Sequence, residues 1–322
     1  MTVRDGAVPT AAGTRVPDRE AFRVLDVVFG LVWVFNAVYQ LRPAYRNGLF
    51  LESIAARPGQ ASGYVAFTHQ IMRWVEALGA GRVALACTAT AALLALALLS
   101  GRALRAAAWV GTVYCLVLWT VVGHLGGPYT RGATDPGTLI VYALVFVFIL
   151  LTLDGPRRDR PAPEATETGR RARYRAARLL FGLLWAFDAA WKWTPFFLHH
   201  ADSYLVQAQA GQPEWIRAYI QFFLDVIHRV GPTAFGVAAA LAETVIAAGL
   251  LAGRGLGFVL PFGLLYSLAV WTTAEGWGGP YGAVTGVAGD VLGTTIIYAL
   301  LFLYLMVMYR RRAGFPSTPD SP

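Results

Sequence analysis

The stretch FGLVWVFNAVYQLRP at residues 29–43 returns as FGLLWAFDAAWKWTP at residues 181–195, an offset of 152 positions (181 − 29). The same offset separates the Gly-Gly-Pro-Tyr motif at 126–129 from its copy at 278–281 (278 − 126 = 152). Self-similarity at a fixed offset indicates an internal repeat, so we interpret the chain as a tandem duplication. Positions at which the two copies carry chemically different residues are then candidates for functional residues.

The composition is typical of a membrane protein, because 56% of the residues are hydrophobic and only 14% are charged. The mean hydropathy is +0.50. A helix needs about 20 apolar residues to cross the hydrocarbon core of a bilayer. Apolar runs near that length occur at 22–41, 82–100, 104–123, 136–153, 174–194, 233–252, 255–274 and 292–310.

These runs predict an all-α integral membrane protein made of two tandem four-helix units, with eight transmembrane helices in all. Since each unit has an even number of spans, both units enter the bilayer from the same side and the repeats are parallel. Parallel repeats argue against the inverted-repeat transporters but leave transporters built from parallel halves open. We predict a tail at 1–21, a first repeat at 22–153, a linker at 154–173, a second repeat at 174–310 and a tail at 311–322.

Arginines gather in the N-terminal tail, in the central linker and at 310–312. Cytoplasmic segments retain basic residues, so we predict a multi-pass protein of the plasma membrane with both termini in the cytoplasm. The same arginines account for most of the formal net charge of +8, which therefore does not indicate a nucleic-acid partner.

Two long loops on the opposite side, 42–81 and 195–232, carry aromatic and aliphatic residues at helical spacing. We predict an amphipathic interfacial helix in each loop, lying in the headgroup plane. Two hypotheses follow for these helices: they form a lid over a functional site, or they only cover the mouth of each bundle.

The first spans of the two repeats differ in charge. Asn36 and Gln40 in the first repeat align with Asp188 and Lys192 in the second, and each pair is four residues apart on one helical face. Lys192 is the only lysine in the chain and stands between two tryptophans. An ionisable residue inside a membrane span marks a functional candidate. The alternative is an interfacial lysine whose charged end reaches the headgroups.

Two further acidic residues appear only in the second repeat. Glu243 replaces Ala91 in the middle of a span, and Glu275 replaces Gly123 just before the Gly-Gly-Pro-Tyr turn. A carboxylate at the depth of Glu243 needs protonation or a cationic partner, which Lys192 supplies if the two side chains meet. We therefore predict that the second repeat contains the functional cluster. The alternative is a set of polar groups that lock helix packing.

All five histidines fall on or just under the outer face, too shallow for ligation of haem by two histidines. The sequence has no HExxH motif and no paired CxxC motif, so we predict no metal site. His124 and its neighbours on that face are candidates for proton handling only.

Three motifs of the second repeat resemble the DoxX/DoxD superfamily of four-helix membrane proteins. They are FGLLWAFDAAWKWTP at 181–195, AETVIAAGLLAGRG at 242–255, and Gly-Thr-x-x-Ile-Tyr-Ala-Leu at 293–300. In that superfamily a lysine ends the first helix and a glutamate opens the second span, and Lys192 and Glu243 match those places. Gln40 and Ala91 of the first repeat depart from both.

DoxD-type members of the superfamily are similar to the membrane subunit of thiosulfate:quinone oxidoreductase. The resemblance implies a quinone cofactor, a small anionic sulfur substrate such as thiosulfate, and a second redox subunit. If the chain is such an oxidoreductase, the differences between the repeats favour Lys192 as the cation that stabilises an anionic substrate or semiquinone, with Glu243 and Asp188 tuning it and Glu275 or His124 moving protons. We expect the quinone to be lined by Trp191, Trp193 and Tyr281. The competing hypothesis is a non-enzymatic membrane scaffold or small-solute carrier.

Overall fold

The computed structural model describes residues 18–127, 135–153, 163–279 and 292–313, and every regular element among them is helical. The N-terminal half contains α1 Asp18–Gln40, η1 Tyr45–Leu49, α2 Phe50–Ile54, α3 Ser62–Leu78, α4 Ala80–Ser100, α5 Leu104–Val121, η2 His124–Gly126 and α6 Thr138–Leu153. The C-terminal half contains α7 Pro163–Lys192, α8 Pro195–His200, α9 Asp202–Ala208, α10 Glu214–Val230, α11 Pro232–Ala252, α12 Leu256–Thr272, η3 Gly276–Gly278 and α13 Thr295–Ala313.

Four of the described helices are long and apolar enough to cross a membrane: α1, α4, α5 and α11. The helices α6, α12 and α13 are apolar but shorter. The counterpart of α1 in the C-terminal half is α7, which carries Arg178, Asp188 and Lys192 within its apolar portion. The fold is therefore all-helical with several membrane-length apolar helices, which is consistent with a membrane protein.

The segment expected as a linker differs from the prediction. Only residues 154–162 separate α6 from α7, because α7 begins at Pro163 and continues without a break to Lys192. The stretch 164–177 is rich in alanine, glutamate and arginine, which favour helix strongly. Proline at the first position of a helix is also favourable, since its missing N–H has no partner there. Residues 163–173 thus lengthen the helix rather than form a loop.

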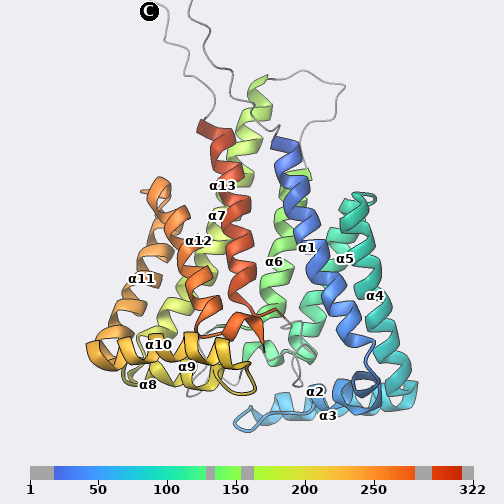
Figure 1. Cartoon of the computed structure of the whole chain (residues 1–322). Helices are drawn as coiled ribbons and strands as arrows, with labels where there is room; N and C mark the ends of the chain where they lie inside the picture. The colour runs from blue at the N-terminus through green and yellow to red at the C-terminus, as the bar shows by residue number, and fades with distance from the viewer. Residues whose placement is uncertain (1–17, 128–134, 154–162, 280–291, 314–322) are drawn as a thin grey trace, which may run out of the picture.

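The long helices run roughly alongside one another, with α6 and α13 at the centre (Figure 1). The helices α2, α3, α8, α9 and α10 cross one end of this bundle (Figure 1). The start of α1, the start of α7 and the end of α13 all lie at the other end (Figure 1).

The two halves repeat the same helix contacts. In the N-terminal half α1 packs on α4 and α5 packs on α6, while in the C-terminal half α7 packs on α11 and α12 packs on α13. The close approach of α5 to α6 depends on Gly111, because an added Cβ would come within 2.3 Å of Phe146. The close approach of α12 to α13 depends in the same way on Gly263, whose added Cβ would come within 2.1 Å of Phe302. The glycines are 152 positions apart (263 − 111) and the phenylalanines 156 (302 − 146).

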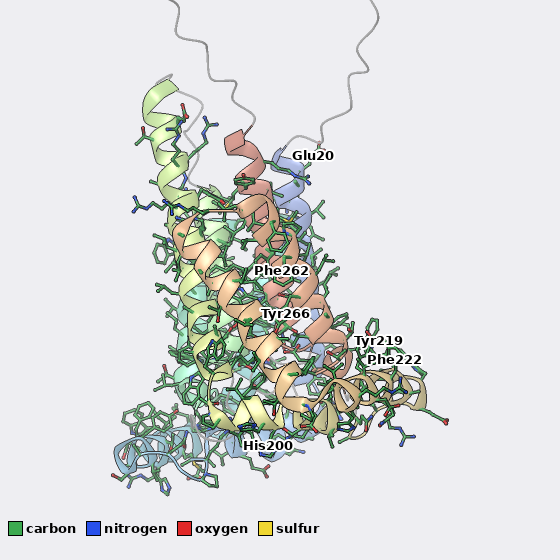
Figure 2. All side chains as sticks on the ribbon, turned by 90° about the vertical axis from the view of Figure 1, so that its left-hand side faces the viewer. Glu20, His200, Tyr219, Phe222, Phe262 and Tyr266 are labelled. Carbon is green, nitrogen blue, oxygen red and sulfur yellow. The ribbon has the colours of Figure 1, made fainter. Side chains whose placement is uncertain are left out.

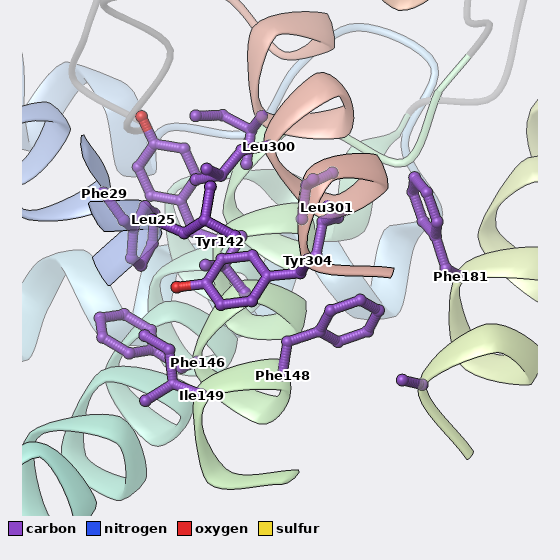
Figure 3. Close-up of a cluster of buried hydrophobic side chains, with 14 of the residues drawn as sticks. Leu25, Phe29, Tyr142, Phe146, Phe148, Ile149, Phe181, Leu300, Leu301 and Tyr304 are labelled. Atoms are coloured by element: carbon purple, nitrogen blue, oxygen red, sulfur yellow. The ribbon is translucent and has the colours of Figure 1, made fainter. Parts of the chain in front are cut away.

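One hydrophobic core is shared between the halves. Figure 3 shows residues from α1, α6, α7 and α13 packed together, including Phe29, Phe148, Phe181 and Tyr304. At its outer edge the buried hydroxyl oxygens of Thr138 and Thr294 lie 2.6 Å apart. Thr138 is the first residue of α6 and Thr294 directly precedes α13, and the two are 156 positions apart (294 − 138). The halves therefore meet through matching positions.

Candidate functional site

The candidate site lies on one face of α7. Trp185, Asp188 and Lys192 are spaced three and four residues apart, so their side chains project from the same side of the helix. The helix ends at Lys192, where Thr194 is extended and Pro195 starts α8. The turn brings the ring of Phe197 to 4.7 Å from Lys192 Nζ, a distance at which a cation interacts favourably with an aromatic face.

Lys192 meets Glu243 of α11. Lys192 Nζ lies 3.6 Å from Glu243 Oε1, and the two side chains are 13% and 6% exposed. That separation is an ion pair, but it is too long for a charge-assisted hydrogen bond. Tyr266 of α12 donates its hydroxyl to the same oxygen at 3.0 Å, whereas Glu243 Oε2 has no hydrogen-bond partner. Lys192 and Glu243, whose separation the sequence left open, thus meet in the structure, and one carboxylate oxygen has no hydrogen-bond partner.

Asp188 is held in a similar way by a second tyrosine. Tyr298 of α13 donates its hydroxyl to Asp188 Oδ2 at 2.6 Å, and Asp188 Oδ1 has no hydrogen-bond partner. Asp188 is close enough to Glu243 and Lys192 for their charges to act on it. The structure therefore brings the three predicted ionisable residues into one buried cluster.

Aromatic side chains enclose this cluster. The ring of Trp185 lies 5.2 Å from Tyr298, 6.0 Å from Tyr266 and 5.7 Å from Phe302. Its indole N–H is buried and has no hydrogen-bond partner. Tyr266 lies partway along the bundle, well away from the end at which His200 is found (Figure 2). The site is thus a polar patch inside apolar walls.

The N-terminal half has the same tyrosines without the charges. Asn36 Nδ2 donates to Tyr142 Oη at 3.3 Å, in the place of the Asp188–Tyr298 contact. With Ala91 in the place of Glu243, Tyr114 donates instead to the backbone oxygen of Cys87 at 3.2 Å. The aromatic frame is common to both halves, and the ionisable groups belong to one.

Glu275 acts as a cap for α13. Its carboxylate accepts hydrogen bonds from the backbone N–H groups of Thr294 and Thr295, both at 3.1 Å, and from Thr295 Oγ1 at 2.8 Å. A carboxylate at a helix N-terminus is stabilised by the helix dipole. Burial nevertheless raises the pKa of Glu275 to about 7, with the hydrogen bonds from Thr295 opposing this and the negative charge of Asp135 adding to it. We expected Glu275 to move protons, and in the structure it caps α13.

The other predicted residues lie outside the cluster. His124 Nε2 is 3.0 Å from the backbone oxygen of Ser53, and its ring packs on Tyr64, so its neighbours belong to the N-terminal half. Burial lowers the pKa of His124. Trp193 is 43% exposed and donates its indole N–H to Thr244. Trp191 packs on Phe187.

Tyr281, expected to line the quinone, lies outside the described residues. The histidines of the second outer loop form local contacts: His228 pairs with Asp202 at 3.2 Å and His199 with Thr233 at 3.1 Å.

Sequence reasoning missed Asp26. This buried residue of α1 accepts a hydrogen bond from Tyr304 of α13 at 2.6 Å, across the boundary between the halves. The equivalent positions are Arg178 and Phe148 (26 + 152 = 178; 304 − 156 = 148). Comparing the copies at these positions would have found a second charged difference, this time with the acid in the N-terminal half.

Comparison with known proteins finds no matching protein-family model, no matching curated protein and no matching solved structure.

Proposed function

We propose that the chain is the membrane subunit of a quinone-linked oxidoreductase that uses thiosulfate or a related small sulfur anion as electron donor. The observation that carries this proposal is the buried cluster of Asp188, Lys192 and Glu243, each acid held by a tyrosine and each with one oxygen still unpartnered. Buried ionisable groups with unused hydrogen-bonding capacity are characteristic of functional sites. The resemblance of three motifs to the DoxX/DoxD superfamily supports the choice of chemistry.

We further propose that the chain crosses the membrane eight times as two parallel four-helix units. Support comes from the repeated helix contacts and from the direct contact of Thr138 with its counterpart Thr294. A residue that contacts its own counterpart is what an axis of approximate two-fold symmetry between the two units produces. In this arrangement α3 and α10 are interfacial helices on the outer side, and both termini are cytoplasmic, as the arginine distribution favours.

The residues of the cluster fit a quinone. A bound quinone takes up two electrons and two protons, so its site needs hydrogen-bond donors, proton carriers and apolar walls. Lys192 and the indole N–H of Trp185 are donors, and Asp188 and Glu243 are carboxyl groups able to hold and release protons. The surrounding aromatic rings exclude water, which strengthens each electrostatic interaction within.

Each residue then has a distinct task. Lys192 binds negative charge, whether of the sulfur anion or of the reduced carrier, because its ammonium donors are not used up by a short contact to Glu243. Tyr266 and Tyr298 orient the two carboxyl groups by donating to one oxygen of each. The second oxygen of each carboxyl group is thereby directed away from its tyrosine and left for substrate protons.

A proton route to the outside follows α13. Thr294 and Thr295 lie one helical turn before Tyr298, so the Glu275 carboxylate that they bind is one turn further out than the Tyr298–Asp188 pair. With a pKa of about 7, Glu275 exchanges protons readily at neutral pH. We assign it the release or uptake of protons at the outer surface.

The test uses purified protein in nanodiscs with thiosulfate and a soluble quinone analogue. Lys192→Met and Glu243→Gln should each lower the rate of quinone reduction at least a hundredfold, while Gln207→Met, a change at an exposed position of α9, should leave it within about twofold. Absence of quinone reduction by the wild type, alone and with any co-purifying subunit, would refute the oxidoreductase. Solute flux into liposomes that Lys192→Met abolishes would instead establish a carrier.

A further inference from the structure

We propose that the N-terminal half contains a second, uncharged binding site for the same lipid-soluble carrier, formed by Trp33, Asn36 and Gln40. This inference rests on the proposed function for the identity of its ligand. The three residues stand three and four positions apart and therefore share one face of α1. They are the counterparts of Trp185, Asp188 and Lys192.

The polar groups of this site are deeply buried and have unused hydrogen-bonding capacity. Trp33, Asn36 and Gln40 are 2%, 1% and 3% exposed. Trp33 Nε1, Asn36 Oδ1 and Gln40 Oε1 have no hydrogen-bond partner. Leaving one such group unsatisfied costs about 1–3 kcal/mol. Three on one helical face, each the counterpart of a residue of the charged cluster, indicate a site for a ligand that supplies the missing partners.

The aromatic walls are the same as those of the charged cluster. The ring of Trp33 lies 5.6 Å from Tyr142, 6.1 Å from Tyr114 and 5.7 Å from Phe146. The matching distances around Trp185 are 5.2, 6.0 and 5.7 Å. The aromatic rings of the two frames are therefore arranged with matching geometry.

Charge distinguishes the two sites. The N-terminal site has Asn36, Gln40 and Ala91 where the other site has Asp188, Lys192 and Glu243. Amide and methyl side chains carry no charge at ordinary pH. A charged ligand placed here would be desolvated without a counter-charge, which is strongly unfavourable. The ligand must be neutral.

The donor and acceptor pattern selects a hydroquinone. Asn36 Oδ1 and Gln40 Oε1 are acceptors set on residues four apart, about 6 Å along the helix axis. A six-membered ring with hydroxyl groups at opposite ends can donate to both, while the indole N–H of Trp33 donates to a ring oxygen. Amide groups do not take up the protons of a quinol. The N-terminal site therefore holds the reduced carrier without reacting with it, as a place of exchange between the charged site and the membrane.

The test measures the binding stoichiometry of a short-chain benzoquinol, without thiosulfate, to the full chain in nanodiscs. We expect two equivalents per chain for the wild type and one for Asn36→Leu/Gln40→Leu. The triple variant D188N/K192Q/E243A gives the C-terminal half the residues of the N-terminal half. It should still bind two equivalents while losing quinone reduction.

Each outcome decides between the two proposals. One equivalent in the wild type, or two retained in Asn36→Leu/Gln40→Leu, would overturn the second site and leave the proposed function standing. No binding to the wild type would overturn both. Trp33→Phe serves as a gentler variant should the double substitution fail to fold, as judged by helicity and size-exclusion profile. Loss of the single hydrogen bond from Trp33 should lower the affinity for the second benzoquinol roughly five- to tenfold. Unchanged affinity would count against the site.

Discussion

The substitution Lys192→Met tests the central ion pair most sharply, because it leaves Glu243 buried without its cation. Two unit charges 3.6 Å apart attract by about 4.6 kcal/mol at an effective dielectric of about 20. The variant can avoid part of this loss if Glu243 takes up a proton. Protonating a glutamic acid of ordinary pKa at pH 7 costs about 3–4 kcal/mol. This cost is the upper limit of the unfolding free energy that the variant loses.

The expected loss of unfolding free energy is therefore about 3 kcal/mol at pH 7. It should shrink by about 1.4 kcal/mol for each unit of lower pH, because protonation becomes easier. The assay is unfolding by sodium dodecyl sulfate titration in mixed micelles, followed by circular dichroism. In the double variant Lys192→Met/Glu243→Gln the two losses should be strongly non-additive, with a coupling of about 2–3 kcal/mol. Gln207→Met, at an exposed position of α9, is the control and should change stability by less than about 0.5 kcal/mol.

A coupling below about 1 kcal/mol, the value of an exposed salt bridge, would refute the buried ion pair. A loss that does not change with pH would refute the proton uptake by Glu243.

Three further results follow from the packing and from the outer loops. Gly263→Ala should destabilise the fold by about 2 kcal/mol in the same assay, because its Cβ would fall 2.1 Å from Phe302. Gly257→Ala, on the same helix with open space around it, should be neutral or stabilising, and equal effects would contradict the packing. The pKa of Glu275 is raised to about 7, above its unfolded value, so the protonated carboxyl stabilises the fold at acid pH and this contribution is lost as pH rises through 7. Glu275→Gln should flatten that limb of the stability–pH profile, and an unaltered profile would count against the buried carboxyl. Burial lowers the pKa of His124, so its contribution has the opposite sign: it is present above the unfolded pKa and lost as pH falls. His124→Gln should remove the loss of stability at acid pH that His124 causes and should leave the rest of the stability–pH profile unchanged.

The sequence was informative wherever the two copies could be compared. The hydrogen bond from Trp119 Nε1 to the Pro136 oxygen recurs in the C-terminal half as the bond from Trp271 Nε1 to the Leu292 oxygen. The two donors are 152 positions apart (271 − 119) and the two acceptors 156 (292 − 136). The comparison also singled out Asp188, Lys192 and Glu243, and the structure brings them together. Helical spacing accounts for the shared face of Asp188 and Lys192, since that depends only on local geometry.

Contacts between distant helices could not be obtained in this way. Spacing along α7 does not reveal that Tyr298 and Tyr266 hold the two carboxyl groups, because these tyrosines come from α13 and α12. Comparing the copies marks Asp26 itself as a charged difference, but its contact with Tyr304, 278 positions away, could not be predicted from spacing. The capping role of Glu275 was not predicted, because Glu275 lies 19 positions before Thr294 and so leaves no local capping signature.

The most direct test of the account is the rate of thiosulfate-dependent quinone reduction by the triple variant D188N/K192Q/E243A. This chain keeps the aromatic frame in both halves and differs from the wild type only in the three ionisable groups that distinguish them. We predict a folded protein of unchanged helicity that reduces quinone at less than about 1% of the wild-type rate. A triple variant that retains the wild-type rate would show that the buried cluster of the C-terminal half does not perform the reaction.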